Sequence, residues 1–165
     1  MKEIVKKIIK PIMLPLWWQD ILVAIPRMVC GYLVAVHFGA DKFGLPWSPA
    51  DKNLGLFEIA FWFPADVAKY GGLFATFSSF LAWMAGFSEA VGGILLLLGL
   101  QTRIASFLIL STMLVAIFMQ QIHQGLWNTL PALGFLWVSL HTLVLGSGRF
   151  GIDYLISKNW NNENK

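Results

Sequence analysis

Two ionisable side chains, Arg27 and Glu89, stand in stretches of the sequence that are otherwise almost wholly apolar. A charge inside a bilayer is costly unless it is protonated, paired or facing a wet cavity. With a rise of about 1.5 Å per residue, Arg27 would lie about 9 Å and Glu89 about 15 Å from the same membrane face. An arginine side chain can bridge that offset. We therefore expect Arg27 and Glu89 to meet inside a membrane.

Small residues at every fourth position accompany both charges, and such runs allow two helices to pack closely in lipid. They are Gly31, Ala35 and Gly39 after Arg27, with Ala82, Gly86 and Ala90, and also Ala85 and Gly93, around Glu89. We call these runs of small residues seams. If the seams face each other, the two charges form either an ion pair that fixes helix register or a polar pocket for an anion or a quinone head group. The third alternative is that they do not touch. His141 lies at a depth similar to that of Arg27 and could extend the pocket, or be a hydrogen-bonded core histidine.

Three further side chains are candidates for the outer face: His37, Lys42 and His123. Two histidines near one membrane face could hold a haem or a metal. No acidic or cysteine ligand accompanies them at ligand spacing, so we expect no metal site and favour interfacial hydrogen bonding. At the opposite face, Arg103 and Arg149 are typical cytoplasmic anchors. Asp153 could pair with either arginine and attach the C-terminal segment to the turn near residue 101.

The composition indicates an integral membrane protein. Of the 165 residues, 57% are hydrophobic and only 13% are charged, whereas soluble domains carry about 25% charged residues. The net charge of +3 comes from scattered basic residues, which gives no nucleic-acid footprint. One cysteine, Cys30, excludes an intrachain disulfide, and no nucleophile–base set or nucleotide-binding motif is present.

Four apolar stretches are long enough to cross a bilayer as helices. They run over about 21–40, 77–100, 104–120 and 130–145. Between the first two, residues 43–76 leave the hydrocarbon. The aromatic part of this segment, residues 53–63, is predicted to be a short interfacial helix or strand stopped by Pro64. The fold class is therefore all-α, an integral membrane four-helix bundle with a long aromatic outer loop between spans one and two.

Basic residues set the expected orientation. Placing both termini in the cytoplasm puts most lysines and arginines there and leaves Lys42, Lys52 and Lys69 outside. The expected organisation is a basic amphipathic N-terminal segment (1–20), a four-span domain (21–156) and a polar tail (157–165), of which the run from Asn159 is expected to be disordered.

Several short motifs occur in an order that resembles the DoxX/DoxD family of small four-helix bacterial membrane proteins. They are Arg27 with Gly31, Gly39-x-x-Lys42, Glu89-x-x-Gly92-Gly93, Thr102-Arg103 and Gly148-Arg149-Phe150-x-x-Asp153. They extend from Arg27 to Asp153. The sequence departs from the family pattern at Gly151, where serine is usual, and in its longer outer loop.

The resemblance implies a multi-pass protein of the bacterial inner membrane. Some relatives are subunits of quinone-linked thiosulfate oxidation and others associate with membrane oxidoreductases. The expected function is an accessory or membrane-anchor subunit of a quinone-linked oxidoreductase, with quinone as the candidate cofactor and other oxidoreductase subunits as candidate partners. The alternative is a non-enzymatic scaffold that binds other membrane proteins through its seams and outer loop. Whether the chain is itself an enzyme stays open.

Overall fold

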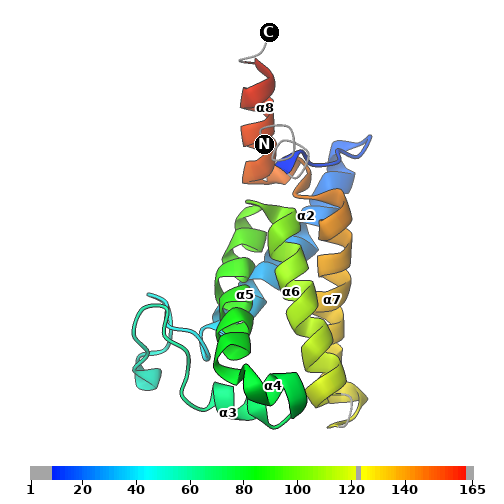
Figure 1. The fold of residues 1–165 in the computed structure, drawn as a ribbon. Helices are drawn as coiled ribbons and strands as arrows, with labels where there is room; N and C mark the ends of the chain where they lie inside the picture. The colour runs from blue at the N-terminus through cyan, green and yellow to red at the C-terminus, as the bar shows by residue number, and fades with distance from the viewer. Residues whose placement is uncertain (1–8, 122–123, 163–165) are drawn as a thin grey trace.

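The described part of the chain contains four helices that are long and apolar enough to span a membrane, as the hydropathy pattern predicts. The computed structural model describes residues 9–121 and 124–162. The spans are α2 with η1 (Trp17–Tyr32 and Leu33–Gly39), α5 (Ser78–Leu98), α6 with η3 (Thr102–Ala116 and Ile117–Gln121) and α7 (Leu126–Leu145). Figure 1 shows them side by side in one bundle. The expected span limits agree with the structure to within about four residues, and the described residues form no strand beyond one isolated bridge.

The first and second spans pack through the small residues that the sequence indicates. A Cβ atom on Gly31 would lie 2.5 Å from the backbone nitrogen of Leu97, and one on Gly93 would lie 2.7 Å from that of Ala35. Further along, a Cβ on Gly39 would lie 2.5 Å from the nitrogen of Ala90. The backbones are therefore in direct contact, which only glycine permits at these positions. The two predicted seams do face each other.

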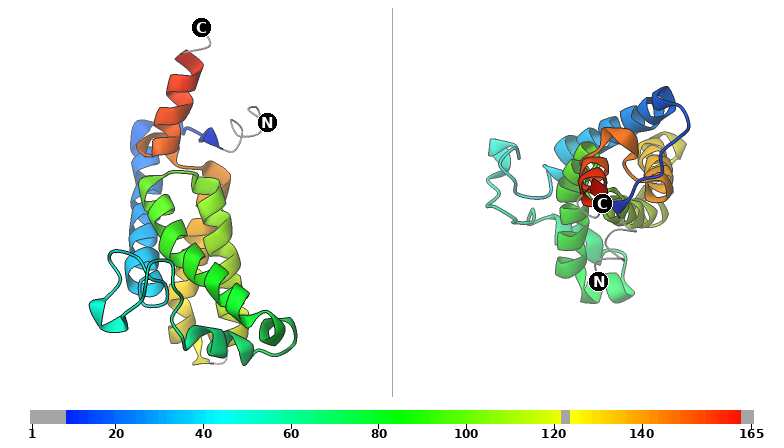
Figure 2. Two further views of the ribbon diagram at one scale, coloured as in Figure 1. Left: turned by 60° about the vertical axis from the view of Figure 1, so that its left-hand side comes forward. Right: turned by 90° about the horizontal axis from the view of Figure 1, so that it is seen from above.

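An apolar core fills the space between these helices and α6 and α7. Its fully buried members include Val34, Leu96 and Ile109, with Met113 and Phe135 against them. Because α2 lies behind the row that α5, α6 and α7 form, these side chains meet at the centre of the bundle (Figures 1 and 2). This packing stabilises the bundle, because the hydrophobic effect does not favour association of apolar helices that are already surrounded by lipid.

The segment between the first two spans lies at one end of the bundle, which we call the α3–α4 end. It contains η2 (Ala50–Lys52), α3 (Phe63–Ala68) and α4 (Gly72–Thr76). Figure 2 shows its first part standing off to one side of the bundle, while α3 and α4 close the end. The aromatic stretch 53–63 is neither the helix nor the regular strand that we expected. It makes one antiparallel bridge, Phe43 with Ile59, and Pro64 opens α3 instead of ending a preceding element.

The opposite end of the bundle, the α8 end, gathers the beginning and the end of the described chain. The Ile12 amide donates to the Leu145 carbonyl at 2.8 Å, and α8 (Ile152–Asn162) rises beyond the spans (Figure 1). The expectation of disorder from Asn159 is wrong as far as Asn162, because α8 continues to that residue. The basic part of the predicted amphipathic N-terminal segment falls mainly on residues 1–8, which lie outside the described residues.

Candidate functional site

Glu89 is paired with Lys42 and not with Arg27. The Lys42 Nζ atom lies 2.7 Å from Glu89 Oε2, and the exposed fractions of the two side chains are 21% and 4%. Lys42 Nζ also lies 5.2 Å from the centre of the Phe63 ring, a cation–π contact. Glu89 is the twelfth residue of α5, about 17 Å along the helix from its first residue. The carboxylate is therefore deep in the bundle and needs its partner.

Lys42 is held in place by the backbone around it. Its carbonyl accepts from the Ala60 amide at 2.8 Å, and its amide donates to the Gly39 carbonyl at 3.1 Å. The neighbouring Phe43 is fully buried, with its ring against Trp83 and Phe87. The bridge between Phe43 and Ile59 thus fixes the start of the outer segment where the ammonium group can reach into α5.

The predicted contact between Arg27 and Glu89 is wrong because the register of the two seams differs from the one that the sequence analysis assumes. Gly31 packs on Gly93 and Leu97, and Gly39 packs on Ala90. One turn before Gly31, Arg27 therefore meets the C-terminal end of α5, and one turn after Gly39, Lys42 meets Glu89. From the sequence, Lys42 is only an outer-face candidate.

Arg27 forms hydrogen bonds with the C-terminal end of α5. Its guanidinium donates to the carbonyls of Leu96 and Leu97 and, at 2.9 Å, to that of Phe150. The last carbonyls of a helix have no partner within it, so Arg27 satisfies two of them. Asp153 supplies a carboxylate whose charge acts on Arg27. Arg27 lines neither of the two cavities described below.

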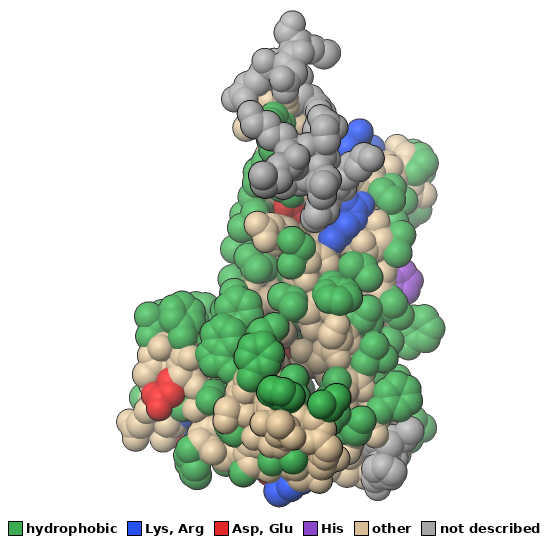
Figure 3. Space-filling view, viewed as in Figure 1, with side chains coloured by type: hydrophobic (Ala, Val, Ile, Leu, Met, Phe, Trp, Pro, Cys, Tyr) green, Lys and Arg blue, Asp and Glu red, His purple; other side chains and the backbone are tan. Residues whose placement is uncertain are grey.

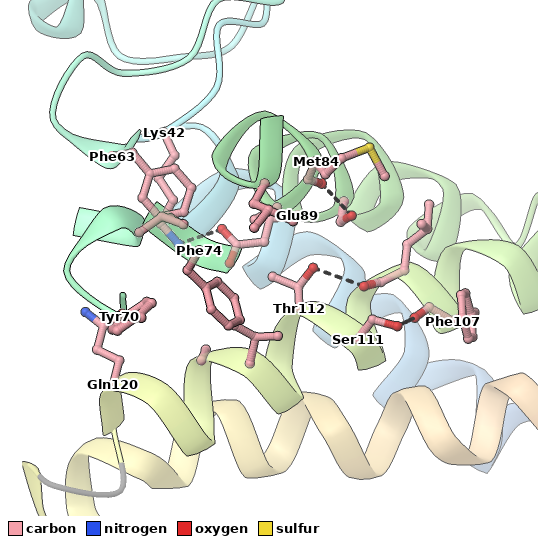
Figure 4. Close-up of a pocket in the computed structure, with 17 residues that line it drawn as sticks. Lys42, Phe63, Tyr70, Phe74, Met84, Glu89, Phe107, Ser111, Thr112 and Gln120 are labelled. Atoms are coloured by element: carbon pink, nitrogen blue, oxygen red, sulfur yellow. Dashed lines mark hydrogen bonds and ion pairs between the residues drawn. The ribbon is translucent and has the colours of Figure 1, made fainter. Parts of the chain in front are cut away.

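A cavity of about 290 Å³ opens beside the Lys42–Glu89 pair. Its floor comes from α5 and α6 and its cover from α3, α4 and the residues between them (Figure 4). Most of the lining is apolar, with Phe63, Phe74 and Phe107 among the rings. In Figure 3 a hollow is visible above α4 on the face that α5 and α6 form. Because Phe107 on this face is 58% exposed, the cavity opens toward the surface that lipid would cover.

Polar groups enter this apolar cavity at a few points. Besides the ion pair they are Tyr70, Ser88, Ser111, Thr112 and Gln120. A largely apolar pocket with a few polar groups is the usual form of a small-molecule site, and such pockets span about 300–1,000 Å³. The volume here is at the low end of that range, which suits one ring-sized group and not a large ligand.

The structure does not bring His141 to Glu89. His141 is exposed on α7, where Nδ1 lies 2.7 Å from the carbonyl of Trp137. It lines a second cavity of about 290 Å³ between α2 and α7. His37 is exposed on η1, with its ring 5.9 Å from that of Tyr32. His123 lies outside the described residues.

The residues predicted for the cytoplasmic edge do gather at the α8 end. Both carboxylate oxygens of Asp153 are used: Oδ1 accepts from the Gln101 amide at 2.7 Å, and Oδ2 accepts from the amide and hydroxyl of Thr102, each at 2.9 Å. Asp153 thus joins the C-terminal segment to the turn after α5, as expected, but through Thr102 and backbone amides and not through an arginine. It also satisfies the first amides of α6.

The two arginines of this edge have other partners. Arg149 Nε lies 3.1 Å from Asp20 Oδ2, and its Nη2 donates to the Leu14 carbonyl at 2.9 Å. Arg103 donates to the carbonyls of Leu143 and Val144 at the end of α7. The sequence analysis missed Asp20, which is 1% exposed. Its acidic type within the first turn of an apolar helix is the signal that could have identified it.

The architecture defines a class: a multi-pass helical membrane protein in which a deep ion pair borders a mainly apolar cavity. The DoxX family model matches residues 22–122, which include the ion pair and all the residues that line the cavity beside it, and the chain belongs to that family. No curated protein and no solved structure matches the chain.

Proposed function

We propose that this protein is an accessory or membrane-anchor subunit of a quinone-linked oxidoreductase, and that the cavity beside Lys42 and Glu89 holds the quinone ring. The observation that carries the proposal is a ring-sized cavity, about 290 Å³, which combines aromatic walls with a buried ion pair. An isoprenoid quinone has a polar ring and an apolar tail, and it reaches proteins through the bilayer. The opening beside Phe107 suits a ligand that arrives from lipid.

The proposed setting is the bacterial inner membrane, with the α8 end in the cytoplasm. This orientation places Arg103 and Arg149 inside, as the positive-inside rule favours. The cavity then lies toward the outer half of the membrane, and the α3–α4 end faces the outside. Partner subunits of the oxidoreductase would supply the redox centre.

The test is to purify the full-length protein in mild detergent without added quinone, extract it with organic solvent, and identify the extract by mass spectrometry. We expect isoprenoid quinone near equimolar amounts. Ala85→Leu, which narrows the cavity, should remove most of it. Ala75→Leu is the matched control, because Ala75 is exposed on α4 and is not a lining residue. Quinone absent from the parent protein, or equal in both variants, contradicts the proposal.

The second candidate is a non-enzymatic scaffold, and one observation favours it. The outer segment exposes large apolar side chains, including Leu56 at 66% and Phe61 at 92%, which a partner protein could cover. The seams of Gly31 and Gly93 are already occupied by packing between the first two spans, so a scaffold would have to bind through the outer segment. Stoichiometric partners without any bound quinone would favour this function.

A further inference from the structure

The hydroxyl groups on the α5–α6 wall of the cavity have already donated their protons. Ser88 donates to the Met84 carbonyl at 2.6 Å, Ser111 to that of Phe107 at 2.8 Å, and Thr112 to that of Leu108 at 3.0 Å. Figure 4 shows these bonds running back along each helix. Because a hydroxyl has one proton and two lone pairs, these three groups accept a hydrogen bond from a ligand as long as they keep their bonds to the helix carbonyls.

Glu89 adds a further acceptor to the same wall. Lys42 occupies Oε2, and within the described part of the chain no donor bonds to Oε1. The residue is 3% exposed and lines the cavity. An ionised carboxylate accepts and does not donate. The second oxygen of this buried carboxylate is therefore a group to which a ligand in the cavity can supply a hydrogen bond.

Donors lie on the α3–α4 side of the cavity, and one of them, Lys42, lies against Glu89. Lys42 carries two N–H groups beyond the one that meets Glu89, and Tyr70 and Gln120 lie together toward the α3–α4 end in Figure 4. Burial raises the pKa of Tyr70, and the charge of Asp66 raises it further, so the phenol keeps its proton. The cavity thus has an accepting wall and a donating end.

We propose, building on the proposed function, that the cavity selects the hydroquinone form of its ligand over the quinone form. One ring hydroxyl donates its single proton to the wall of acceptors that Glu89, Ser111 and Thr112 form. Because Lys42 lies against Glu89, the oxygen at the opposite side of the ring accepts from Tyr70 or Gln120 at the α3–α4 end. The ligand class is a ring with hydroxyl groups at opposite positions and an apolar tail.

The quinone form fits only one of the two ends. Both of its oxygens are acceptors, so one can bind the donors but the other faces acceptors. Sites built to bond a substrate hydroxyl discriminate strongly against analogues that lack it. A quinone that takes two electrons from the reduced partner enzyme and two protons from water becomes the hydroquinone. If the hydroquinone binds tenfold more tightly, the potential of the bound couple rises by about 30 mV, which makes the bound quinone a better electron acceptor.

The test measures the binding of three probes to the full-length protein in lipid nanodiscs by anaerobic calorimetry. The probes are 2-decyl-1,4-hydroquinone, the corresponding benzoquinone, and the dimethyl ether of the hydroquinone. We expect the hydroquinone to bind at least about tenfold more tightly than the other two. The double variant Ser111→Ala/Thr112→Val, which changes little in shape, should reduce that ratio at least about threefold through weaker hydroquinone binding. Glu89→Gln places an N–H donor on the wall and should improve quinone binding. His141→Gln, in the second cavity, is the control and should change nothing.

The outcomes separate the two proposals. Equal binding of hydroquinone and quinone, or a preference that survives in both variants, overturns the inferred selection and leaves a quinone site. Binding of neither form to the parent protein overturns the quinone site itself, and the selection with it.

Discussion

The ion pair between Lys42 and Glu89 makes an asymmetric prediction about stability. At 2.7 Å and an effective dielectric constant of about 20, the attraction is about 6 kcal/mol before desolvation is subtracted. Removing one partner of a buried pair costs about 3–5 kcal/mol, because the other charge is left unpaired. The two partners differ in how they can avoid that cost. The variants that separate them are Lys42→Met and Glu89→Gln, which preserve shape.

Lys42→Met should be the more damaging change. It leaves a carboxylate that is 4% exposed without the cation that lies 2.7 Å from it. We therefore expect a loss of about 3–4 kcal/mol. In Glu89→Gln the amide oxygen still accepts from Lys42, whose side chain is 21% exposed and can extend toward water. That loss should be about 1–2 kcal/mol.

The assay is reversible unfolding of the purified protein in mixed micelles titrated with SDS. The double variant should be more stable than the sum of the single losses predicts, by about 2 kcal/mol. Additive losses, or a Glu89→Gln variant that loses as much stability as Lys42→Met, would refute the reasoning.

Three further predictions concern packing, orientation and the outer segment. Gly31→Ala should destabilise by about 1–3 kcal/mol or more through overpacking, whereas Gly134→Ala, where a Cβ meets nothing within 4 Å, should be neutral or stabilising by up to about 1 kcal/mol; equal effects in the same SDS assay would contradict the close seam. In intact cells an impermeant thiol reagent should label Lys52→Cys and not Gln101→Cys in a Cys30→Ser background, and the reverse pattern would invert the orientation. Amide exchange over residues 57–60 should be at least about tenfold slower than in a free peptide, since Phe57 and Ala60 donate to backbone carbonyls at 2.8 Å; exchange at the free-peptide rate would show that this pairing does not persist.

The sequence was sufficient for the spans and for the face by which the first two pack. Hydropathy and length determine a spanning helix, and glycine at every fourth position marks a close contact irrespective of register. The join between Asp153 and the turn after α5 was also predicted. For the spans and their packing face the signal is local, a run or a spacing within one segment.

Pairing between segments was harder to predict, and the error concerned Glu89. Two four-residue seams can slide by one turn without losing their complementarity, so the small residues alone did not decide which cation meets the carboxylate. The bridge of Phe43 with Ile59 helps to position Lys42, and neither residue type signals such a bridge. The cavity depends on α3 and α4, two short helices in a segment whose sequence predicts only a single interfacial element.

The π-helical turns of η1 have a consequence for helical phase. Along an α-helix, a stripe of every fourth residue advances by about 40° per step, so Arg27, Gly31 and Ala35 gradually rotate around the axis. In η1 each amide bonds to the carbonyl five residues earlier instead of four, as from the Ala40 amide to the Ala35 carbonyl. Because a π-helical turn contains more than four residues, every fourth residue falls short of a full turn there. The two drifts oppose each other. As a result Gly31 and Gly39 both remain against the backbone of α5, and Lys42 lies beside Glu89 although the first span is long enough for an unbroken α-helical stripe to have rotated away from α5.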